Sequence, residues 1–265
     1  MNEIAEIEHH LALIKHQIYV KEWRPNATQC LEKACIILLH ESLGCVALWK
    51  DFPRKLAEVT QRRVIAYDRL GFGQSSALSH QLPLNFVTLE AEQTFASVVQ
   101  KFDLKKFIVM GHSVGGGMAS VCASVFPTLC KAVIVESAQS FVEAVTLAGI
   151  QEAKNNFQKE QLFQRLAKYH AEKTQWVLDA WTETWLSAEF QNWHLDDILP
   201  QVYCPMLIVH GEQDEYATLA QPQRFAELTQ GEKKWVILSD CGHFPHFEKS
   251  SEVLNIIKNF LAEIE

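Results

Sequence analysis

The sequence lacks a long apolar run and has no excess of basic residues. A membrane-spanning helix needs roughly 18–20 consecutive apolar residues, and no stretch approaches that length. The 24 Lys and Arg are outnumbered by 32 Asp and Glu, which gives a net charge of −8. Binding to nucleic acid depends on a basic face that meets the phosphates. We therefore expect neither a nucleic-acid partner nor a membrane partner.

Cysteine pairs with regular spacing are also missing. The seven cysteines include no C-x-x-C, their number is odd, and several lie inside apolar runs. This usage is typical of reduced core thiols in an intracellular protein. Residues 1–8 are acidic and lack the basic-then-apolar order of a secretory signal. We therefore expect a cytoplasmic location. No Cys and His cluster has the spacing of metal ligands, so we expect no metal and no cofactor.

What the chain does contain is an alternation of short apolar runs with amphipathic stretches. The apolar runs predict strands at 17–23, 34–39, 64–67, 107–110, 132–135, 206–209 and 235–238. The amphipathic stretches predict helices at about 46–60, 86–102, 114–125, 218–229 and 250–264. The first run alternates polar and apolar residues and predicts an edge strand. The five runs from 34–39 to 206–209 are apolar throughout and are typical of strands covered on both faces. The pattern predicts an α/β protein with a mostly parallel sheet flanked by helices.

One long stretch interrupts this alternation. Residues 140–199 show no strand signal, are helix-prone and contain four of the seven tryptophans. We therefore predict a core in two parts, 1–139 and 200–265, with a helical insertion at 140–199. Trp181 and Trp185 are four residues apart and share a helix face. They either pack the insertion onto the core or line a pocket for an apolar substrate.

Residues 111–115 read Gly-His-Ser-Val-Gly and follow a predicted strand directly. A serine hydroxyl is a weak nucleophile, so it has to be presented on a sharp turn where a base can reach it. Such a turn brings backbone against backbone, and Gly111 and Gly115 leave the room it needs. The motif predicts that Ser113 is the nucleophile of an acyl-transfer enzyme.

A nucleophilic serine needs a base, and the base is sought among 11 histidines. His243 follows the last predicted strand, whose carboxyl end meets the same rim of a parallel sheet as Ser113; His246 is its rival. We interpret His112 and His210 as packing residues at strand ends. Six further histidines are interpreted as surface residues in helical or loop contexts: His9, His10, His16, His80, His170 and His194.

The base in turn needs a carboxylate that holds its tautomer. Asp214 follows the strand predicted at 206–209 and fits this role, with Glu212 and Glu215 as rivals. Two backbone N–H groups should stabilise the oxyanion. One belongs to Val114, directly after the nucleophile, and the other to the loop 40–44.

Together these motifs resemble the α/β-hydrolase superfamily. Residues 111–116 resemble its nucleophile elbow, 210–214 its acid turn, and 241–248 its histidine loop, which favours His243 over His246. Residues 68–75, Asp-Arg-Leu-Gly-Phe-Gly-Gln-Ser, resemble its D-x-x-G-x-G-x-S turn. The order nucleophile, acid, histidine matches the family, and the insertion matches the position of its helical lid.

Two departures from the family pattern bear on the site. The oxyanion loop usually reads His-Gly-x, but here it reads His40-Glu41-Ser42. The resemblance implies an oxyanion N–H on Ser42, with Leu43 as the alternative, and Glu41 and Leu43 are candidate pocket residues. Phe244 is another; relatives that cleave carbon–carbon bonds often carry tryptophan at its position.

The sequence therefore predicts a serine hydrolase that works through an acyl-enzyme. The expected substrate is a small or medium ester, thioester or lactone with an apolar part. The alternatives are a carbon–carbon hydrolase, perhydrolase or lyase on the same fold, because fold does not fix function, or a binding protein that senses a ligand. A haloalkane or epoxide hydrolase would need an aspartate at position 113.

Overall fold

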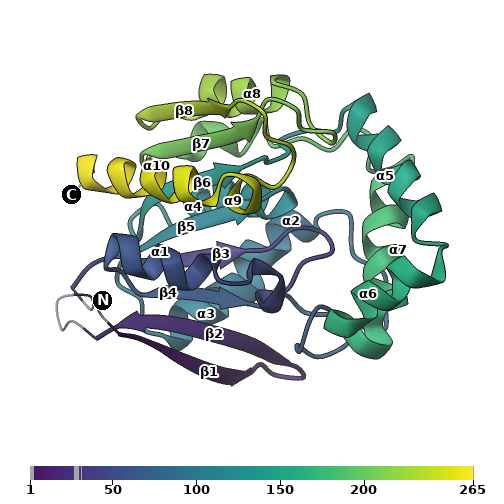
Figure 1. Cartoon of the computed structure of the whole chain (residues 1–265), viewed down its shortest axis with the longest axis horizontal. Coiled ribbons are helices and arrows are strands. Elements are labelled where there is room, and N and C mark those ends of the chain that lie inside the picture. The colour runs from purple at the N-terminus through teal and green to yellow at the C-terminus, as the bar shows by residue number, and fades with distance from the viewer. Residues whose placement is uncertain (1–2, 27–29, 31, 265) are drawn as a thin grey trace.

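A central sheet carries the site, and the computed structural model describes residues 3–26, 30 and 32–264. In these residues the sheet has eight strands in the order β1-β2-β4-β3-β5-β6-β7-β8. Pairing is antiparallel between β1, β2 and β4 and parallel from β4 to β8 (Figure 1). The strands are β1 (Ile4–Ala12), β2 (Gln17–Pro25), β3 (Cys35–Leu39), β4 (Val64–Tyr67), β5 (Phe107–His112), β6 (Cys130–Glu136), β7 (Met206–Gly211) and β8 (Lys233–Leu238). The predicted α/β class with a mostly parallel sheet is confirmed.

The edge of the sheet is not where the sequence pattern predicted it. The stretch 17–23 lies in β2, which pairs with β1 on one side and β4 on the other, so the edge prediction is wrong. The edge strand at this end of the sheet is β1, in which the exposed Glu6, Glu8 and His10 alternate with the less exposed Ala5, Ile7 and His9. His9 and His10 lie on β1, which corrects their assignment to a helix or loop.

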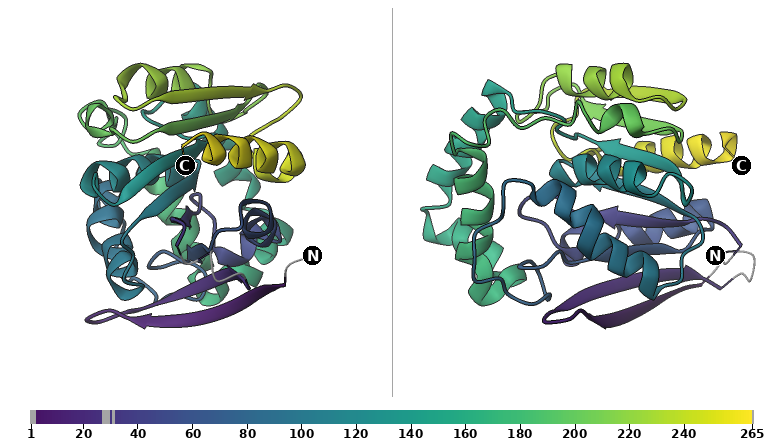
Figure 2. Two further views of the ribbon diagram at one scale, coloured as in Figure 1. Left: turned by 90° about the vertical axis from the view of Figure 1, so that its left-hand side faces the viewer. Right: turned by 180° about the vertical axis from the view of Figure 1, so that it is seen from behind.

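Helices cover both faces of the sheet (Figure 2). On one face lie the 3₁₀ turn η2 (Val46–Trp49), α1 (Phe52–Thr60) and α10 (Ser250–Glu263). On the other lie α2 (Phe86–Leu89), the π-helical turn η3 (Glu90–Phe95), α3 (Ala96–Lys101), α4 (Val114–Val125) and α8 (Ala220–Leu228). Each face buries its own hydrophobic cluster, and burial of this kind is the main stabilising term of such a fold. No helix in the described part of the chain is both long and apolar enough to cross a bilayer.

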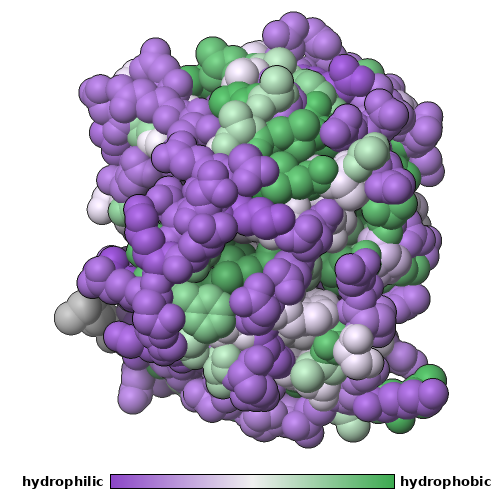
Figure 3. All heavy atoms as spheres, turned by 90° about the vertical axis from the view of Figure 1, so that its right-hand side faces the viewer, coloured by the Kyte–Doolittle hydropathy of each residue, from purple (hydrophilic) through white to green (hydrophobic). Residues whose placement is uncertain are grey.

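A helical layer stands at one end of the sheet. It consists of α5 (Ala144–Asn156), α6 (Glu160–His170), the short turn η4 (Ala171–Lys173) and α7 (Thr174–Trp185), all between β6 and β7 (Figure 1). The 3₁₀ turn η5 (Leu199–Gln201) then leads back to the sheet. Figure 3 views the molecule from this end, where hydrophilic side chains cover most of the face and hydrophobic ones show between them.

The helical layer is fastened to the core near the junction of α6 and α7. The buried Lys173 donates hydrogen bonds to the carbonyl oxygens of Phe72, Gly73 and Ser75, at 3.2, 2.5 and 2.5 Å. The ring of His170 accepts the Gly73 N–H at Nδ1 (2.9 Å) and donates from Nε2 to the Leu43 carbonyl (2.9 Å). His170 is fully buried, so its interpretation as a surface residue is wrong.

Candidate active site

Ser113 stands on a strained turn between β5 and α4. Its φ is +56°, a conformation that non-glycine residues rarely adopt. A Cβ on Gly111 would lie 1.9 Å from the Gly115 carbonyl oxygen, and a Cβ on Gly115 would lie 2.3 Å from the Leu39 carbonyl oxygen. The two glycines therefore meet the steric need that the motif implies, since backbone packs directly against backbone.

His243 and Asp214 lie in direct contact. His243 Nδ1 is 2.9 Å from Asp214 Oδ1 and 2.8 Å from Oδ2. Oδ1 also accepts the N–H groups of Tyr216 (2.8 Å) and Ala217 (3.1 Å). Burial by itself would raise the pKa of Asp214, but the bonds to His243 and to the backbone lower it overall. The carboxylate therefore stays charged and fixes one nitrogen of the imidazole.

The rival residues are placed elsewhere. His246 pairs with the buried Glu136 through Nδ1 and does not line the pocket that Ser113 and His243 line. His210 Nε2 donates to the Ala217 carbonyl at 3.2 Å. Glu212 and Glu215 are exposed beside the turn that carries Asp214.

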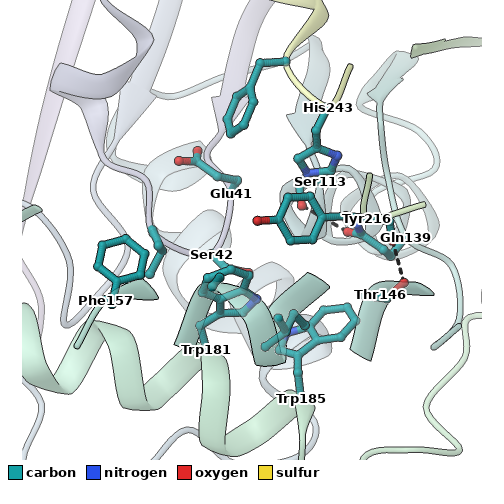
Figure 4. A pocket seen from close by; sticks show the side chains of 14 residues that line it. Glu41, Ser42, Ser113, Gln139, Thr146, Phe157, Trp181, Trp185, Tyr216 and His243 are labelled. Carbon is teal, nitrogen blue, oxygen red and sulfur yellow. Dashed lines mark hydrogen bonds between the residues drawn. The ribbon is translucent and has the colours of Figure 1, made fainter. Parts of the chain in front are cut away.

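The hydroxyl of Ser113 has a partner that the sequence did not suggest. It donates to Gln139 Oε1 at 3.1 Å, and Gln139 lies three residues beyond the end of β6 (Figure 4). A hydroxyl has only one proton to donate. The resting arrangement in this structure therefore directs that proton to Gln139.

The oxyanion loop forms a tight turn. The Gly44 N–H donates to the Glu41 carbonyl at 3.1 Å, and the same oxygen accepts from His40 Nδ1 (2.8 Å) and Arg69 Nη2 (2.9 Å). Burial holds the pKa of His40 well below its usual value, so its Nε2 accepts the Arg69 N–H. Ser42 and Leu43 occupy the centre of this turn, and both line the pocket.

A mostly apolar pocket of about 240 Å³ lies between the sheet and the helical layer. Figure 4 shows Ser113 and His243 on one wall and Trp181 and Trp185 of α7 on another. The five residues predicted for the pocket all line it: Glu41, Leu43, Trp181, Trp185 and Phe244. Six further lining residues were missed: Gln139, Thr146, Ile150, Ala153, Phe157 and Tyr216. Of these, Gln139 alone carried a usable signal, because it follows a strand that ends at the same rim as Ser113.

Three buried side chains beside the pocket could ligate a metal by type. His112, Glu136 and His246 bring their potential ligand atoms within 4.8 Å of one another. Part of their hydrogen bonding serves the protein: His246 pairs with Glu136, and His112 Nε2 donates to the His243 carbonyl at 2.7 Å. His112 thus holds the backbone of the histidine loop, in keeping with its interpretation as a packing residue. Two other atoms of the cluster, His112 Nδ1 and Glu136 Oε1, are buried without a hydrogen-bond partner within the described ranges.

The fold and the elbow define the class of protein, and comparison with known proteins agrees. Residues 36–256 match the model of the alpha/beta hydrolase family, and the chain belongs to this family of hydrolases. The human protein named "Serine hydrolase BPHL" is 27% identical over 246 residues, covering 85% of this chain and 78% of that protein. A proline iminopeptidase of Lactobacillus crispatus is 22% identical over 274 residues, covering 88% and 91%.

Solved structures share the fold at lower identity. A bacterial membrane phospholipase A has a TM-score of 0.76 at 19% identity, covering 98% of this chain and 86% of that one. The 2-hydroxy-6-oxo-6-phenylhexa-2,4-dienoate hydrolase of a Rhodococcus strain has a TM-score of 0.74 at 17% identity, covering 98% and 100%. At these identities the neighbours support the shared fold and do not indicate the substrate.

Proposed function

We propose that this protein is a serine hydrolase that uses Ser113, His243 and Asp214 as a catalytic triad. The observation that carries the proposal is the convergence of three strand ends. Ser113 on its strained turn and His243 share one pocket wall, and His243 is held by the buried Asp214. The motif order and the hydrolase family support the same assignment.

The reaction would proceed in two halves. Ser113 Oγ leaves Gln139, donates its proton to His243 Nε2 and attacks the substrate carbonyl carbon. Asp214 stabilises the imidazolium that results. The tetrahedral intermediate collapses as His243 passes the proton to the leaving alkoxide, which gives an acyl-enzyme and an alcohol. Water, deprotonated by the same histidine, then releases the acid and restores Ser113.

The oxyanion of each intermediate would be held by two backbone N–H groups. Val114 supplies one from the start of α4, and Ser42 supplies the other from the centre of the turn 41–44, with Leu43 as its neighbour in that turn. Losing one such donor typically costs about 10²–10³ in turnover.

The substrate we propose is a small or medium ester, thioester or lactone with an apolar part. The size of the pocket and its aromatic lining support this class. Residues 140–199 would act as the cap that closes the pocket over the core parts 1–139 and 200–265. Trp181 and Trp185 then form the apolar face of that cap.

The test combines labelling with turnover. A fluorophosphonate should label the wild-type protein covalently, and Ser113→Ala should lose both labelling and hydrolysis of p-nitrophenyl esters. The matched control is Ser124→Ala, a serine on α4 whose hydroxyl bonds only to its own helix. Unchanged ester turnover in Ser113→Ala would refute the proposal. A ring-fission diketone assayed alongside tests carbon–carbon cleavage.

A further inference from the structure

Glu41 is the one acidic side chain among the residues that line the described pocket. Its backbone carbonyl is fully used by Gly44, His40 and Arg69, as set out above. Its carboxylate has one ion-pair neighbour in the described part of the chain, His112 Nδ1 at 4.0 Å from Oε2, and the charge of the Arg69 guanidinium acts on it as well. That distance is too long for a hydrogen bond. The carboxylate is thus placed at a pocket wall without a close donor.

His112 faces Glu41 with Nδ1, which lies beyond hydrogen-bond distance of the carboxylate and has no hydrogen-bond partner among the residues that the structure describes. Its Nε2 is committed to the His243 carbonyl, and its fully buried ring packs against Phe244 at 4.9 Å between centroids. Burial would raise the pKa of Glu41, but the facing imidazole of His112 lowers it to about 2. The carboxylate is therefore charged at neutral pH. A charge held in a mostly apolar pocket costs free energy unless a partner meets it.

The aromatic surroundings suit a cationic partner. Figure 4 shows the Glu41 carboxylate turned away from Ser113, toward the side of the pocket where Phe157 lies. Phe244 lines the pocket as well. Aromatic faces attract ammonium groups, and do so more strongly when water is excluded.

We propose that the substrate carries a protonated amine, several bonds from the scissile carbonyl, which seats against the Glu41 carboxylate. The proposal rests on the hydrolase function above and names its substrate class: an ammonium-bearing ester with an apolar body. The amine has to be several bonds from the scissile carbonyl because the Glu41 carboxylate points away from Ser113. An amine directly beside the carbonyl would lie close to Ser113 and would not reach the carboxylate. Glu41 is then a specificity-determining residue.

The first experiment compares pairs of esters that differ only in charge. In the acyl series, benzyl esters of glycine, β-alanine and ε-aminocaproate are paired with those of propanoate, butanoate and heptanoate. In the alcohol series, ammonioalkyl phenylacetates of increasing length are paired with their alkyl counterparts. In the wild type, kcat/KM should favour the ammonium member by at least about tenfold for a longer spacer in one series.

Variants assign that preference to Glu41. In Glu41→Gln the ratio of kcat/KM for the ammonium ester to kcat/KM for the neutral ester should fall to about one. Because it is a ratio, it is unaffected by any loss of activity that the substitution causes for both esters alike. Glu215→Gln removes an exposed charge outside the pocket and should keep the wild-type ratio. Three outcomes would overturn the proposal. The wild type could prefer the neutral ester in every pair, or prefer the ammonium member only for the glycine ester. The ratio could also stay unchanged in Glu41→Gln.

A binding measurement separates this proposal from the proposed function. Phenylbutylammonium and phenylbutanol are titrated calorimetrically into Ser113→Ala, which needs no catalysis. The ammonium should bind at least about tenfold more tightly, and the advantage should vanish in the double variant with Glu41→Gln. Equal binding overturns the proposal even if neutral esters are hydrolysed. Tighter binding of the ammonium by Ser113→Ala, together with no ester turnover by the wild type, would support the ammonium site at Glu41 and refute the hydrolase function.

Discussion

Replacing Gln139 by methionine should make Ser113 more reactive. The Ser113 proton is directed to Gln139 Oε1 at 3.1 Å, whereas attack on a carbonyl requires it to be directed to His243. Both acceptors compete for one proton. Methionine has nearly the length of glutamine but offers only a weak acceptor, so the hydroxyl should turn toward the imidazole more often.

The expected gain follows from the energy of that bond. A hydrogen bond between neutral groups contributes about 0.5–1.5 kcal/mol net. Removing the competing acceptor should therefore raise the population of the reactive hydroxyl orientation by about twofold to tenfold, at 1.4 kcal/mol per tenfold. The assay is the second-order rate constant of labelling by a small fluorophosphonate, which reports on the serine without depending on the substrate.

Thr146→Val is the matched control. Thr146 lines the same pocket, and its hydroxyl donates to the Tyr216 carbonyl rather than to the nucleophile (Figure 4). It should label at the wild-type rate within about twofold. A labelling rate in Gln139→Met at or below that of the wild type would refute the competition, and would make Gln139 a support of the reactive orientation.

Three further predictions concern the acid, the elbow and a buried carboxyl. Asp214→Asn should lower kcat by about 10⁴-fold with the fold intact, because an amide N–H facing His243 favours the wrong tautomer; ester kinetics and circular dichroism measure this. Gly111→Ala should destabilise the protein by about 3 kcal/mol or more in urea unfolding, since its Cβ would meet the Gly115 carbonyl oxygen at 1.9 Å. Burial raises the pKa of Asp68 to about 6, so between about pH 4 and 6 the folded state holds a proton that the unfolded state has released. Stability from this group should fall as pH rises through that window, by about 1–3 kcal/mol, and Asp68→Asn should remove that slope.

Each of these has a clear contrary outcome. Near-normal turnover in Asp214→Asn would remove the acid from the triad. A Gly111→Ala protein as stable as the wild type would show that the elbow relaxes freely. An identical pH slope of the unfolding free energy in Asp68→Asn and the wild type would assign that slope to other carboxyls.

The sequence predicted an element correctly where the element's own residues carry the signal for it. The apolar run 64–67 coincides with β4, and the stretch 114–125 coincides with α4. Both signals are local in the sequence. The strand is marked by a run of apolar residues that are buried on both faces, and the helix begins directly after Ser113. β1 was missed because the N-terminal segment was interpreted by its acidic composition alone, although Ala5 and Ile7 alternate there with Glu6 and Glu8.

The parts of the site that were missed depend on contacts distant in sequence. His170 bonds Gly73 across 97 residues and Leu43 across 127, and nothing next to it in the sequence announces either partner. Phe157 reaches the pocket from the end of α5, and its role arises only once the helical layer is placed over the sheet.

The anchoring of the α6–α7 junction constrains how a substrate can reach Ser113. Swinging that corner outward would break the three hydrogen bonds that the buried Lys173 donates to backbone carbonyl oxygens and would expose its ammonium group to water. It would also pull His170 out from between two backbone segments. We therefore expect substrate to reach Ser113 without displacement of this corner of the helical layer.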